Sequence, residues 1–503
     1  MVNGQWSMVN WIVMLAAVVL LWSAALPPWV SMATVAALAV AFLARAAATR
    51  QITGHTPADW PLLALLLLLL PVGLWASPDL AMTLPRSYAL IAAAALYWAV
   101  AALSDHPWLR YSGWGLLLAG LAMALAVIAA TPLSGSSLLS PLAQAIRAPL
   151  PFLHPDRFNP NLSGQLLAIF LAPAAALALV GGTPGGRTLR LAAAALSLAL
   201  AVLLLLTQSR GALLGVAVAL PVMTLLADRR WLALWLVALG AGLFLLRQSP
   251  QLAATLSTAL LVGGGDVTAT AQGRMELWSR ALYLMQDFPF TGVGLGMPQR
   301  VIDLLYPLFT VVSGSQWLHV HNTYLQIGSE MGIPGLIALA ALLLSVGAAL
   351  VRQARRRHAG AYRGLALGLL GSLIVFAVHG LVDAPLASPK LMVLFFGLMG
   401  LMTAVAASGA NPAKRPAEFA SPDANNPRSS HPQMRTNPTE RPAEFASPDA
   451  NNPRSSHPQM RTNPTERPAE FASSDANEPA KESDDRGTPG RGTGLSGAAG
   501  RAV

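Results

Sequence analysis

The chain has 503 residues, of which 54% are hydrophobic and 11% are charged, and it contains no cysteine. Globular domains are about a quarter charged, so this composition excludes a chain that is water-soluble throughout, and the lack of cysteine excludes disulfides, thiol catalysis and cysteine-based metal sites. The formal net charge of +10 would suit a nucleic-acid partner, but most basic residues lie in loops between apolar runs, which is the pattern of membrane proteins.

Apolar runs long enough to cross a bilayer recur up to residue 408, because a membrane-spanning helix needs about 20 such residues. The alternating strands of an outer-membrane barrel are not seen in the sequence. The first run, Met8–Leu26, follows no basic segment and has no clear cleavage site, so we interpret it as a retained span. We predict an all-α polytopic membrane protein with about twelve spans, near residues 8–26, 29–48, 61–76, 86–103, 112–131, 161–181, 189–206, 211–227, 231–247, 322–350, 364–381 and 390–408.

Basic residues in the loops predict the orientation of the chain. Loops on one side carry twelve of them, namely Arg45, Arg50, Arg110, Arg187, Arg190, Arg229, Arg230, Arg352, Arg355, Arg356, Arg357 and Arg363. The other short loops carry five, namely Arg86, Arg147, Arg157, Arg210 and Lys390. Because basic loops stay in the cytoplasm, we expect both termini there and the long loop 248–321 on the outer side.

Four regions follow along the chain: spans over 1–247, the loop 248–321, three further spans over 322–408 and a tail over 409–503. In the tail, RPAEFASPDANNPRSSHPQMRTNPTE occurs at 415–440, recurs at 441–466 and begins again at 467. The repeat is rich in Pro, Asn, Ser and charge, so it cannot bury a core. We predict a disordered cytoplasmic tail, and a partner-binding array is the alternative.

Residues 268–289 of the long loop, TATAQGRMELWSRALYLMQDFP, have the pattern of an amphipathic helix along the membrane interface. Its predicted apolar face consists of residues at helical spacing: Met275, Trp278, Leu282 and Met285. Glu276 and Arg280 form an i,i+4 pair. The following TGVGLG is interpreted as flexible backbone, and it is weak evidence for phosphate binding because it does not join a strand to a helix.

Two arginines on the predicted outer side run against the charge bias of membrane loops. Arg210 lies beside Gln208 in a short hinge, LTQSRGALLG, and Arg274 begins the loop helix. Each alone can be a snorkelling or solvated residue. Two guanidiniums on one side favour an anion site, because the planar fork of arginine suits phosphate oxygens. Arg147 and Arg157 lie on the same side and are weaker candidates.

A polar cluster marks the start of the tenth predicted span in GSQWLHVHNTYLQIGSEMGIPGL, residues 314–336. Asn322 or Thr323 can cap this helix, and Thr323 with Gln326 matches a T-x-x-Q capping box. Capping does not explain His319 and His321. Both precede the helix, where a histidine can exchange protons near neutral pH.

A metal site is the competing role for this His-x-His pair. The carboxylates on the predicted outer side show no clustered spacing: Asp266, Glu276, Asp287, Asp303 and Asp383. His379 and Asp383, at the outer end of the eleventh span, can line the same cavity as the two histidines. Glu330 is two turns into the tenth span, and we interpret it as structural, bonded at the nearby Gly-Ile-Pro-Gly bend or to a neighbouring helix.

Three segments, TQSRGALLG, FPFTGVGLG and HVHNTYLQIGSEMGIPGL, together resemble the core of the O-antigen ligase and polymerase superfamily. The motifs cover about residues 200–340, and the span count agrees over 1–408. The resemblance implies a GT-C-like glycosyltransferase architecture in the bacterial inner membrane, with the active site facing the periplasm. It also implies transfer from an undecaprenyl-pyrophosphate-linked sugar without nucleotide, cofactor or metal.

The resemblance aligns the histidine of the family with His321, as the base that deprotonates a sugar hydroxyl. His319 is then an acceptor-side or supporting residue, and the reverse roles stay open. Arg210 and Arg274 would stabilise the pyrophosphate leaving group in place of a metal. Four residues are candidates for support: Gln208, Asn322, Asp383 and Arg147. Direct attack with one base predicts inversion at the anomeric carbon.

Within the superfamily, one outer loop of about 70 residues and the lack of a folded domain after the last span favour a ligase. Such an enzyme moves O-antigen polysaccharide from undecaprenyl pyrophosphate to a sugar hydroxyl of lipid A-core. An O-antigen polymerase and a protein O-oligosaccharyltransferase are the alternatives among relatives. A lipid-linked saccharide transporter is the non-enzyme alternative, but it predicts inverted repeats, and matching halves are not seen in the sequence.

Overall fold

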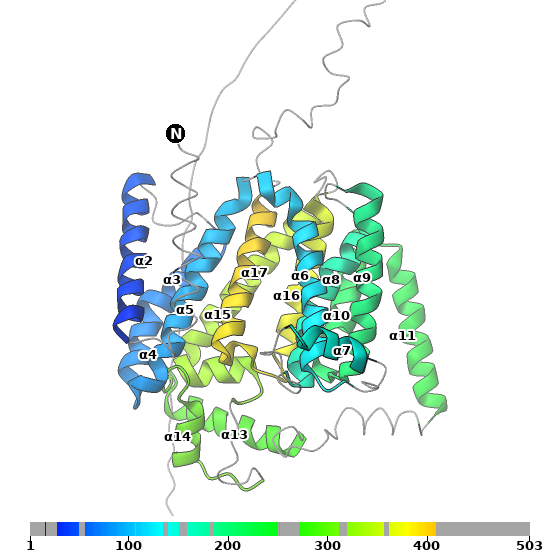
Figure 1. Ribbon diagram of the computed structural model, residues 1–503. Helices are drawn as coiled ribbons and strands as arrows, with labels where there is room; N and C mark the ends of the chain where they lie inside the picture. The colour runs from blue at the N-terminus through cyan, green and yellow to red at the C-terminus, as the bar shows by residue number, and fades with distance from the viewer. Residues whose placement is uncertain are drawn as a thin grey trace, which may run out of the picture. The chain divides into compact units, whose positions relative to one another are not determined.

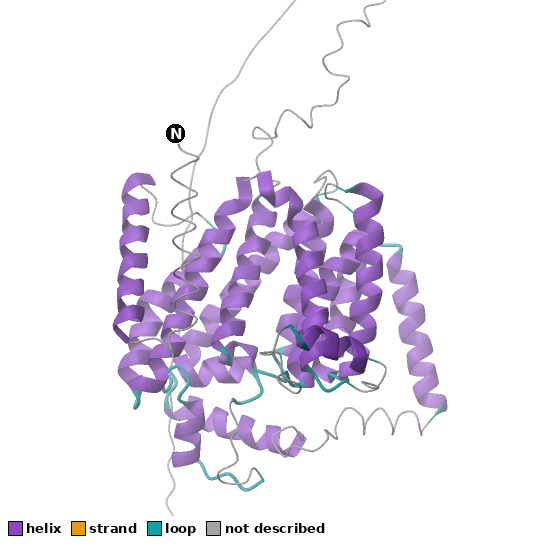
Figure 2. Cartoon of the chain, viewed as in Figure 1, coloured by secondary structure: helices purple, strands orange, loops and turns teal. Residues whose placement is uncertain are grey.

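The structure is a computed structural model that describes residues 16, 28–49, 56–105, 107–133, 139–149, 158–181, 185–249, 251, 271–310, 319–356 and 362–408. Within these ranges all regular structure is helical, which confirms the all-α prediction (Figure 2). The predicted first span, except for Ala16, and the whole repeat tail lie outside the described residues.

The helices occur close to the predicted spans. In chain order they are α2 (Pro28–Thr49), α3 (Asp59–Leu63) continuing through a π-helical stretch (Ala64–Leu69) into α4 (Leu70–Ala76), α5 (Leu80–Ala101), α6 (Ser112–Ala130), α7 (Ser140–Arg147), α8 (Pro160–Val180), α9 (Gly186–Thr207), α10 (Arg210–Ala227), α11 (Trp231–Gln248), α13 (Ala271–Asp287), α14 (Pro298–Leu305), α15 (Thr323–Arg355), α16 (Arg363–His379) and α17 (Pro389–Ala407). Eight of the described segments are long and apolar enough to span a membrane, and three shorter apolar helices accompany them. A multi-pass helical chain is therefore supported, and the count of twelve stays a prediction.

Apolar packing orders these helices into one bundle (Figure 1). α16 packs against α8 and α10, α9 packs against α8, and α17 packs along α5. α8 is the most buried of the candidate spans, whereas α11 lies at the edge of the bundle with Val237 and Leu239 largely exposed. Contiguous apolar surface of this kind is rare on soluble proteins, so the outer faces of the bundle are suited to lipid.

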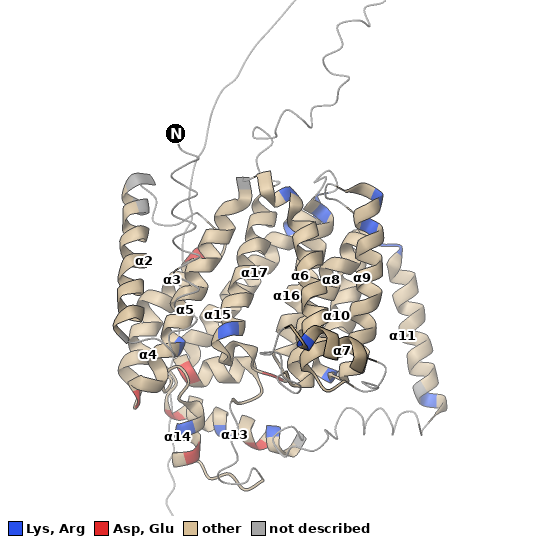
Figure 3. Cartoon of the chain, viewed as in Figure 1, with Lys and Arg blue, Asp and Glu red and all other residues tan. Residues whose placement is uncertain are grey.

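Arginines bind helix ends at one end of the bundle. Arg190 donates to the carbonyls of Ala178 and Leu179 at 3.3 and 3.1 Å, and Arg363 donates to the carbonyl of Ala227 at 2.7 Å. The last carbonyls of a helix lack partners within the helix, so these bonds stabilise the ends of α8 and α10. Both arginines belong to the loops predicted to be cytoplasmic. Figure 3 shows Asp and Glu concentrated at the opposite end, beside α13 and α14.

The helices α13 and α14 form a small apolar cluster at this second end (Figure 1). On α13 the apolar residues buried in this cluster are Leu277, Ala281 and Leu284. Of the predicted apolar face, Trp278 packs against this cluster and Met285 is half-buried, whereas Met275 and Leu282 are 66% and 48% exposed. The helix along the membrane interface stays a prediction. Apolar residues occur on more than one face of α13, and those that contact the segment 293–302 are the ones that are buried. The predicted pair of Glu276 and Arg280 is confirmed, with 3.7 Å between Oε1 and the guanidinium.

The glycine-rich segment 291–296 is held in place, which corrects its interpretation as flexible backbone. Gly332 has φ 70° and ψ −174°, so it breaks α15 and leaves carbonyls of the preceding turn without helical partners. Gly294 donates from its backbone N to the carbonyl of Glu330 at 3.0 Å. A Cβ at Gly292 would lie 2.4 Å from the carbonyl carbon of Glu330, so glycine permits this approach. The backbone groups at the break in α15 thus bind the glycine-rich segment that connects α13 to α14, and so hold these two helices in place.

Candidate functional site

The residues at the start of α15 orient the segment that carries the two histidines. Asn322 caps the helix, since its Oδ1 accepts at 3.0 Å from the backbone N–H groups two and three residues later. The predicted T-x-x-Q box is wrong, because Thr323 is already the first helical residue. Gln326 reaches past the cap and accepts from the backbone N of Val320 at 2.9 Å. The amide of Gln326 therefore fixes the residue between the histidines.

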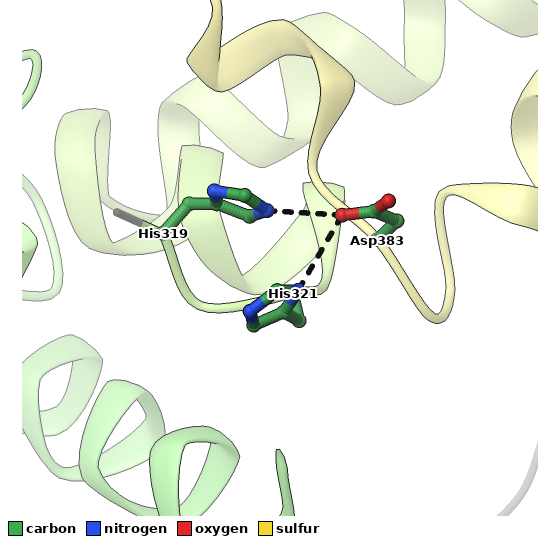
Figure 4. Close-up of side chains that lie close together, drawn as sticks. All are labelled: His319, His321 and Asp383. Atoms are coloured by element: carbon green, nitrogen blue, oxygen red, sulfur yellow. Dashed lines mark hydrogen bonds and ion pairs between the residues drawn. The ribbon is translucent and has the colours of Figure 1, made fainter. Parts of the chain in front are cut away.

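The turn between α16 and α17 brings a carboxylate to these histidines. Thr323 donates from its backbone N to the carbonyl of Gly380 at 2.7 Å and from its hydroxyl to the carbonyl of Asp383 at 3.0 Å. Oδ1 of Asp383 lies 2.9 Å from Nε2 of His319 and 3.5 Å from Nδ1 of His321 (Figure 4). His379 approaches Oδ2 of Asp383 with its Nε2 at 3.5 Å.

These contacts assign the tautomers of the two rings. A carboxylate only accepts hydrogen bonds, so the nitrogen that faces Asp383 carries the proton, which is Nε2 in His319 and Nδ1 in His321. In Figure 4 the other nitrogen of each ring is turned away from Asp383. The free acceptor is therefore Nδ1 in His319 and Nε2 in His321. At 3.5 Å the contact of His321 is long, and its Nδ1 is buried without a closer hydrogen-bond partner among the described residues, so Asp383 is the acceptor nearest to it.

Burial and charge set the protonation of this cluster. Burial raises the pKa of Asp383, but the hydrogen bond from His319 and the longer 3.5 Å contacts of His321 and His379 outweigh it and hold the pKa well below its usual range. Burial lowers the pKa of His321, although its hydrogen bond to Asp383 opposes that effect. At neutral pH the cluster therefore combines an ionised carboxylate with an unprotonated His321, which can accept a proton.

Backbone strain marks the same site. Among the described residues, non-glycine positions with positive φ are Gln208 and His321, each at 54°. Such conformations cost about 1–3 kcal/mol and cluster at functional sites. At His321 this conformation ends the loop immediately before the cap of α15. At Gln208 it ends α9 and makes the hinge from which Arg210 begins α10.

The two predicted arginines act on the same cluster. Burial lowers the pKa of Arg274, the charge of Asp383 raises it, and the charge of Arg210 lowers it. Nε of Arg274 is buried and has no hydrogen-bond partner among the described residues. The first turn of α10 lies directly against α16, since a Cβ at Gly211 would be 2.8 Å from Nδ1 of His379. The structure therefore brings Arg210, Arg274 and the histidines to one site.

The remaining candidates are placed differently. The side chain of Gln208 is exposed. Arg147 donates to the carbonyl of Ala129 at 3.0 Å, so in the described part of the chain it stabilises the end of α6. Arg157 lies outside the described residues.

Glu330 is bonded to a neighbouring helix, as interpreted from the sequence, and its partners were not predicted. Its Oε1 accepts from Arg86 of α5 at 2.6 Å, from Gln326 at 2.7 Å and from the backbone N of Gly296 at 3.0 Å. Because Gln326 also holds Val320, this network connects α5 and the glycine-rich segment to the histidines. A charge inside an apolar helix was the available signal for Arg86 and Glu330.

Replacing Arg86 with methionine is expected to lower the free energy of unfolding by about 3–5 kcal/mol, because it leaves a buried carboxylate without its cation. Arg300→Met is the matched control, since Arg300 also makes a 2.6 Å ion pair to the start of α5, at Asp79, but is 61% exposed. Exposed pairs contribute about 0–1 kcal/mol. Thermal unfolding of both variants in detergent measures the difference. Equal losses of stability would contradict the expectation that the buried Arg86–Glu330 pair stabilises the fold more than the exposed pair does.

The cluster also has the spacing of a metal site, which the carboxylate spacing in the sequence did not indicate. One ligand atom from each of His319, His321 and Asp383 lies within 4.8 Å of the others, and three ligands with an open position are typical of catalytic zinc. Nε2 of His319 and Oδ1 of Asp383 lie at hydrogen-bond distance, 2.9 Å, so binding of a metal would release the proton between two of its ligands.

Fold and site together define a multi-pass helical membrane protein with a histidine, carboxylate and arginine centre at one end of its bundle. Residues 194–340 match the family described as O-antigen ligase, which supports membership of the O-antigen ligase superfamily and confirms the resemblance seen in the motifs. Members of this family are glycosyltransferase-like ligases and polymerases, so an enzyme is supported. No curated protein matches the chain significantly. The matched segment contains Arg210, Arg274, His319 and His321, whereas Asp383 lies outside it.

Proposed function

We propose that the chain is an O-antigen ligase that transfers O-antigen polysaccharide from undecaprenyl pyrophosphate to a sugar hydroxyl of lipid A-core. The reaction takes place on the periplasmic face of the bacterial inner membrane and needs no metal. The observation that carries the proposal is the meeting of an unprotonated histidine, its carboxylate partner and two arginines within a chain that matches the O-antigen ligase family.

In the proposed reaction, Nε2 of His321 accepts the proton of the acceptor hydroxyl as its oxygen attacks the anomeric carbon. A new bond forms between this oxygen and the anomeric carbon, and the bond from that carbon to the phosphate oxygen breaks. Asp383 holds the tautomer of His321 and stabilises the imidazolium that forms, the role a carboxylate has beside other catalytic histidines. One displacement without a covalent intermediate inverts the anomeric carbon.

The leaving group takes the electron pair as undecaprenyl pyrophosphate, and its negative charge grows in the transition state. Arg274 and Arg210 are the proposed partners of this charge. The unpartnered Nε of Arg274 supports the assignment, because a buried guanidinium N–H without an acceptor is costly and a phosphate oxygen is the acceptor arginine suits best. Two adjacent cations also repel, and binding of an anion relieves this repulsion.

Deleting the gene and analysing the lipopolysaccharide tests the proposal. We expect lipid-linked polymer to accumulate while lipid A-core stays bare, with recovery on expression of the parent chain. Core carrying a single repeat unit would instead identify a polymerase. Normal lipopolysaccharide with unglycosylated protein acceptors would identify the protein-directed relative, and unchanged glycans of both kinds would contradict an enzyme of this class.

A further inference from the structure

A cavity of about 470 Å³ adjoins the histidine cluster on the side of His319. His319 and Asp383 line it, whereas His321, Arg210 and Arg274 are not among its lining residues. The electrostatic effect of Arg274 falls on His321 and Asp383. Within the described part of the chain, the cluster thus separates an arginine side from a cavity side, and its volume is within the range of about 300–1,000 Å³ that small-molecule sites have.

The wall of the cavity contains a buried amide without a partner. Gln165 of α8 is 2% exposed and lines the cavity, and its Nε2 has no hydrogen-bond acceptor among the described residues. An unsatisfied buried donor is costly, so it calls for an acceptor oxygen. Asn159 and Gln299 add two more amides to the lining. Oδ1 of Asn159 already caps α8 by accepting from the backbone N of Leu162 at 2.7 Å, so the NH2 group is the part of that amide left for a ligand.

The charges around the cavity disfavour an anionic ligand. Arg86 lines the cavity, but Glu330 neutralises it at 2.6 Å. Asp383 keeps its negative charge beside the histidines that contact it, so an uncharged ligand fits this lining better than a phosphate. The lining also contains the three amides and apolar side chains such as Leu162 and Met82. This lining matches a sugar ring, whose hydroxyl groups can bond the amides and whose apolar C–H faces can pack against the apolar side chains.

We infer that this cavity binds the acceptor sugar, and that Gln165 hydrogen-bonds one of its hydroxyl oxygens. This inference rests on the proposed function, because it assumes that the pyrophosphate of the donor binds on the arginine side of the cluster. It assigns the two substrates to opposite sides of Asp383. The reacting hydroxyl then extends out of the cavity past His319 to reach His321, whose ring centroid lies 4.3 Å from that of His319. Gln165 and Gln299 then determine which end sugar is accepted and do not take part in bond breaking.

Binding of deacylated core oligosaccharide to the purified full chain tests the inference without requiring turnover. Isothermal titration is expected to give a dissociation constant about three- to tenfold higher for Gln165→Met than for the parent, the effect of one lost hydrogen bond. Gln299→Ala, at a more exposed position, should weaken binding in the same direction and guards against a folding defect in the buried variant. Gln286→Met on the exposed face of α13 is the matched control, for which no change is expected.

Transfer kinetics then separate this inference from the proposed function. We expect Gln165→Met to raise the KM for the acceptor and to leave the KM for the lipid-linked donor unchanged. A rise in the donor KM alone, equal binding by Gln165→Met and parent, or absence of binding by the parent would each overturn the acceptor assignment. If the parent binds core oligosaccharide and Gln165→Met weakens it, but no donor is consumed, the cavity assignment holds and the proposed transfer reaction fails.

Discussion

A His321→Ala variant is expected to transfer saccharide about 10²–10⁴-fold more slowly than the parent, which is the usual contribution of a general base. The acceptor hydroxyl is a poor nucleophile unless its proton is removed, and Nε2 of His321 is the nitrogen left free when Nδ1 faces Asp383. Transfer from purified lipid-linked donor to lipid A-core measures the loss. Added imidazole should restore part of the rate, since it can enter the space left by the side chain.

The pH profile distinguishes a base from a residue that only supports the fold. A base works when unprotonated, so the rate falls as pH drops through the pKa of His321. Burial lowers that pKa, so the acid limb should lie below the ordinary value of about 6.5. Asp383 raises the pKa of His321, so Asp383→Asn should move the limb to still lower pH while reducing the plateau.

His319→Ala separates the roles of the two histidines. The charge of His319 lowers the pKa of His321, so this variant should move the acid limb to higher pH and keep more activity than His321→Ala. If His319→Ala abolishes transfer and His321→Ala does not, the roles are reversed. A chelator should leave the parent rate unchanged. Loss of activity that returns with added zinc would assign His319, His321 and Asp383 to a metal.

The spans could be predicted from the sequence because of a single physical constraint. Backbone polar groups inside a bilayer must bond within their own helix, so a helix begins and ends where the apolar run does. The prediction of 211–227, for example, meets the observed Arg210–Ala227 within one residue. Short helices outside the apolar runs give no such signal, and α7 and α14 were not predicted.

Contacts between distant segments set the limit of the prediction. The histidines and arginines were found because their chemistry is unusual at a helix end. The pairing of Arg86 with Glu330 joins positions 244 residues apart, and neither residue alone indicates its partner. Gln165 was missed although a glutamine within the apolar run 161–181 was visible. Its importance follows from the cavity beside it, which depends on how α5, α8 and α17 pack.

Arg274→Gln is expected to lower the turnover number about 10²–10³-fold, the cost of removing one preorganised donor from a developing negative charge. The charge on the leaving pyrophosphate grows in the transition state, so kcat should fall together with kcat/KM, whereas a residue that only binds the donor would change KM alone. Arg274→Lys should keep part of the rate, because lysine supplies the charge without the planar fork. Arg210→Gln is expected to have an effect of similar size.

Arg247→Gln is the matched control for these variants. Arg247 lies in the last turn of α11 and is exposed, so its loss removes the same charge from the protein without touching the histidine cluster. If Arg274→Gln slows transfer no more than Arg247→Gln does, the arginines act only through net charge and the anion site is wrong. If Arg274→Gln and Arg210→Gln are each severe and the double variant is little worse than either, the two guanidiniums hold the pyrophosphate as a unit. We expect this second outcome, because Arg210 and Arg274 interact electrostatically. The leaving charge is shared among several phosphate oxygens, and one arginine alone cannot enclose them.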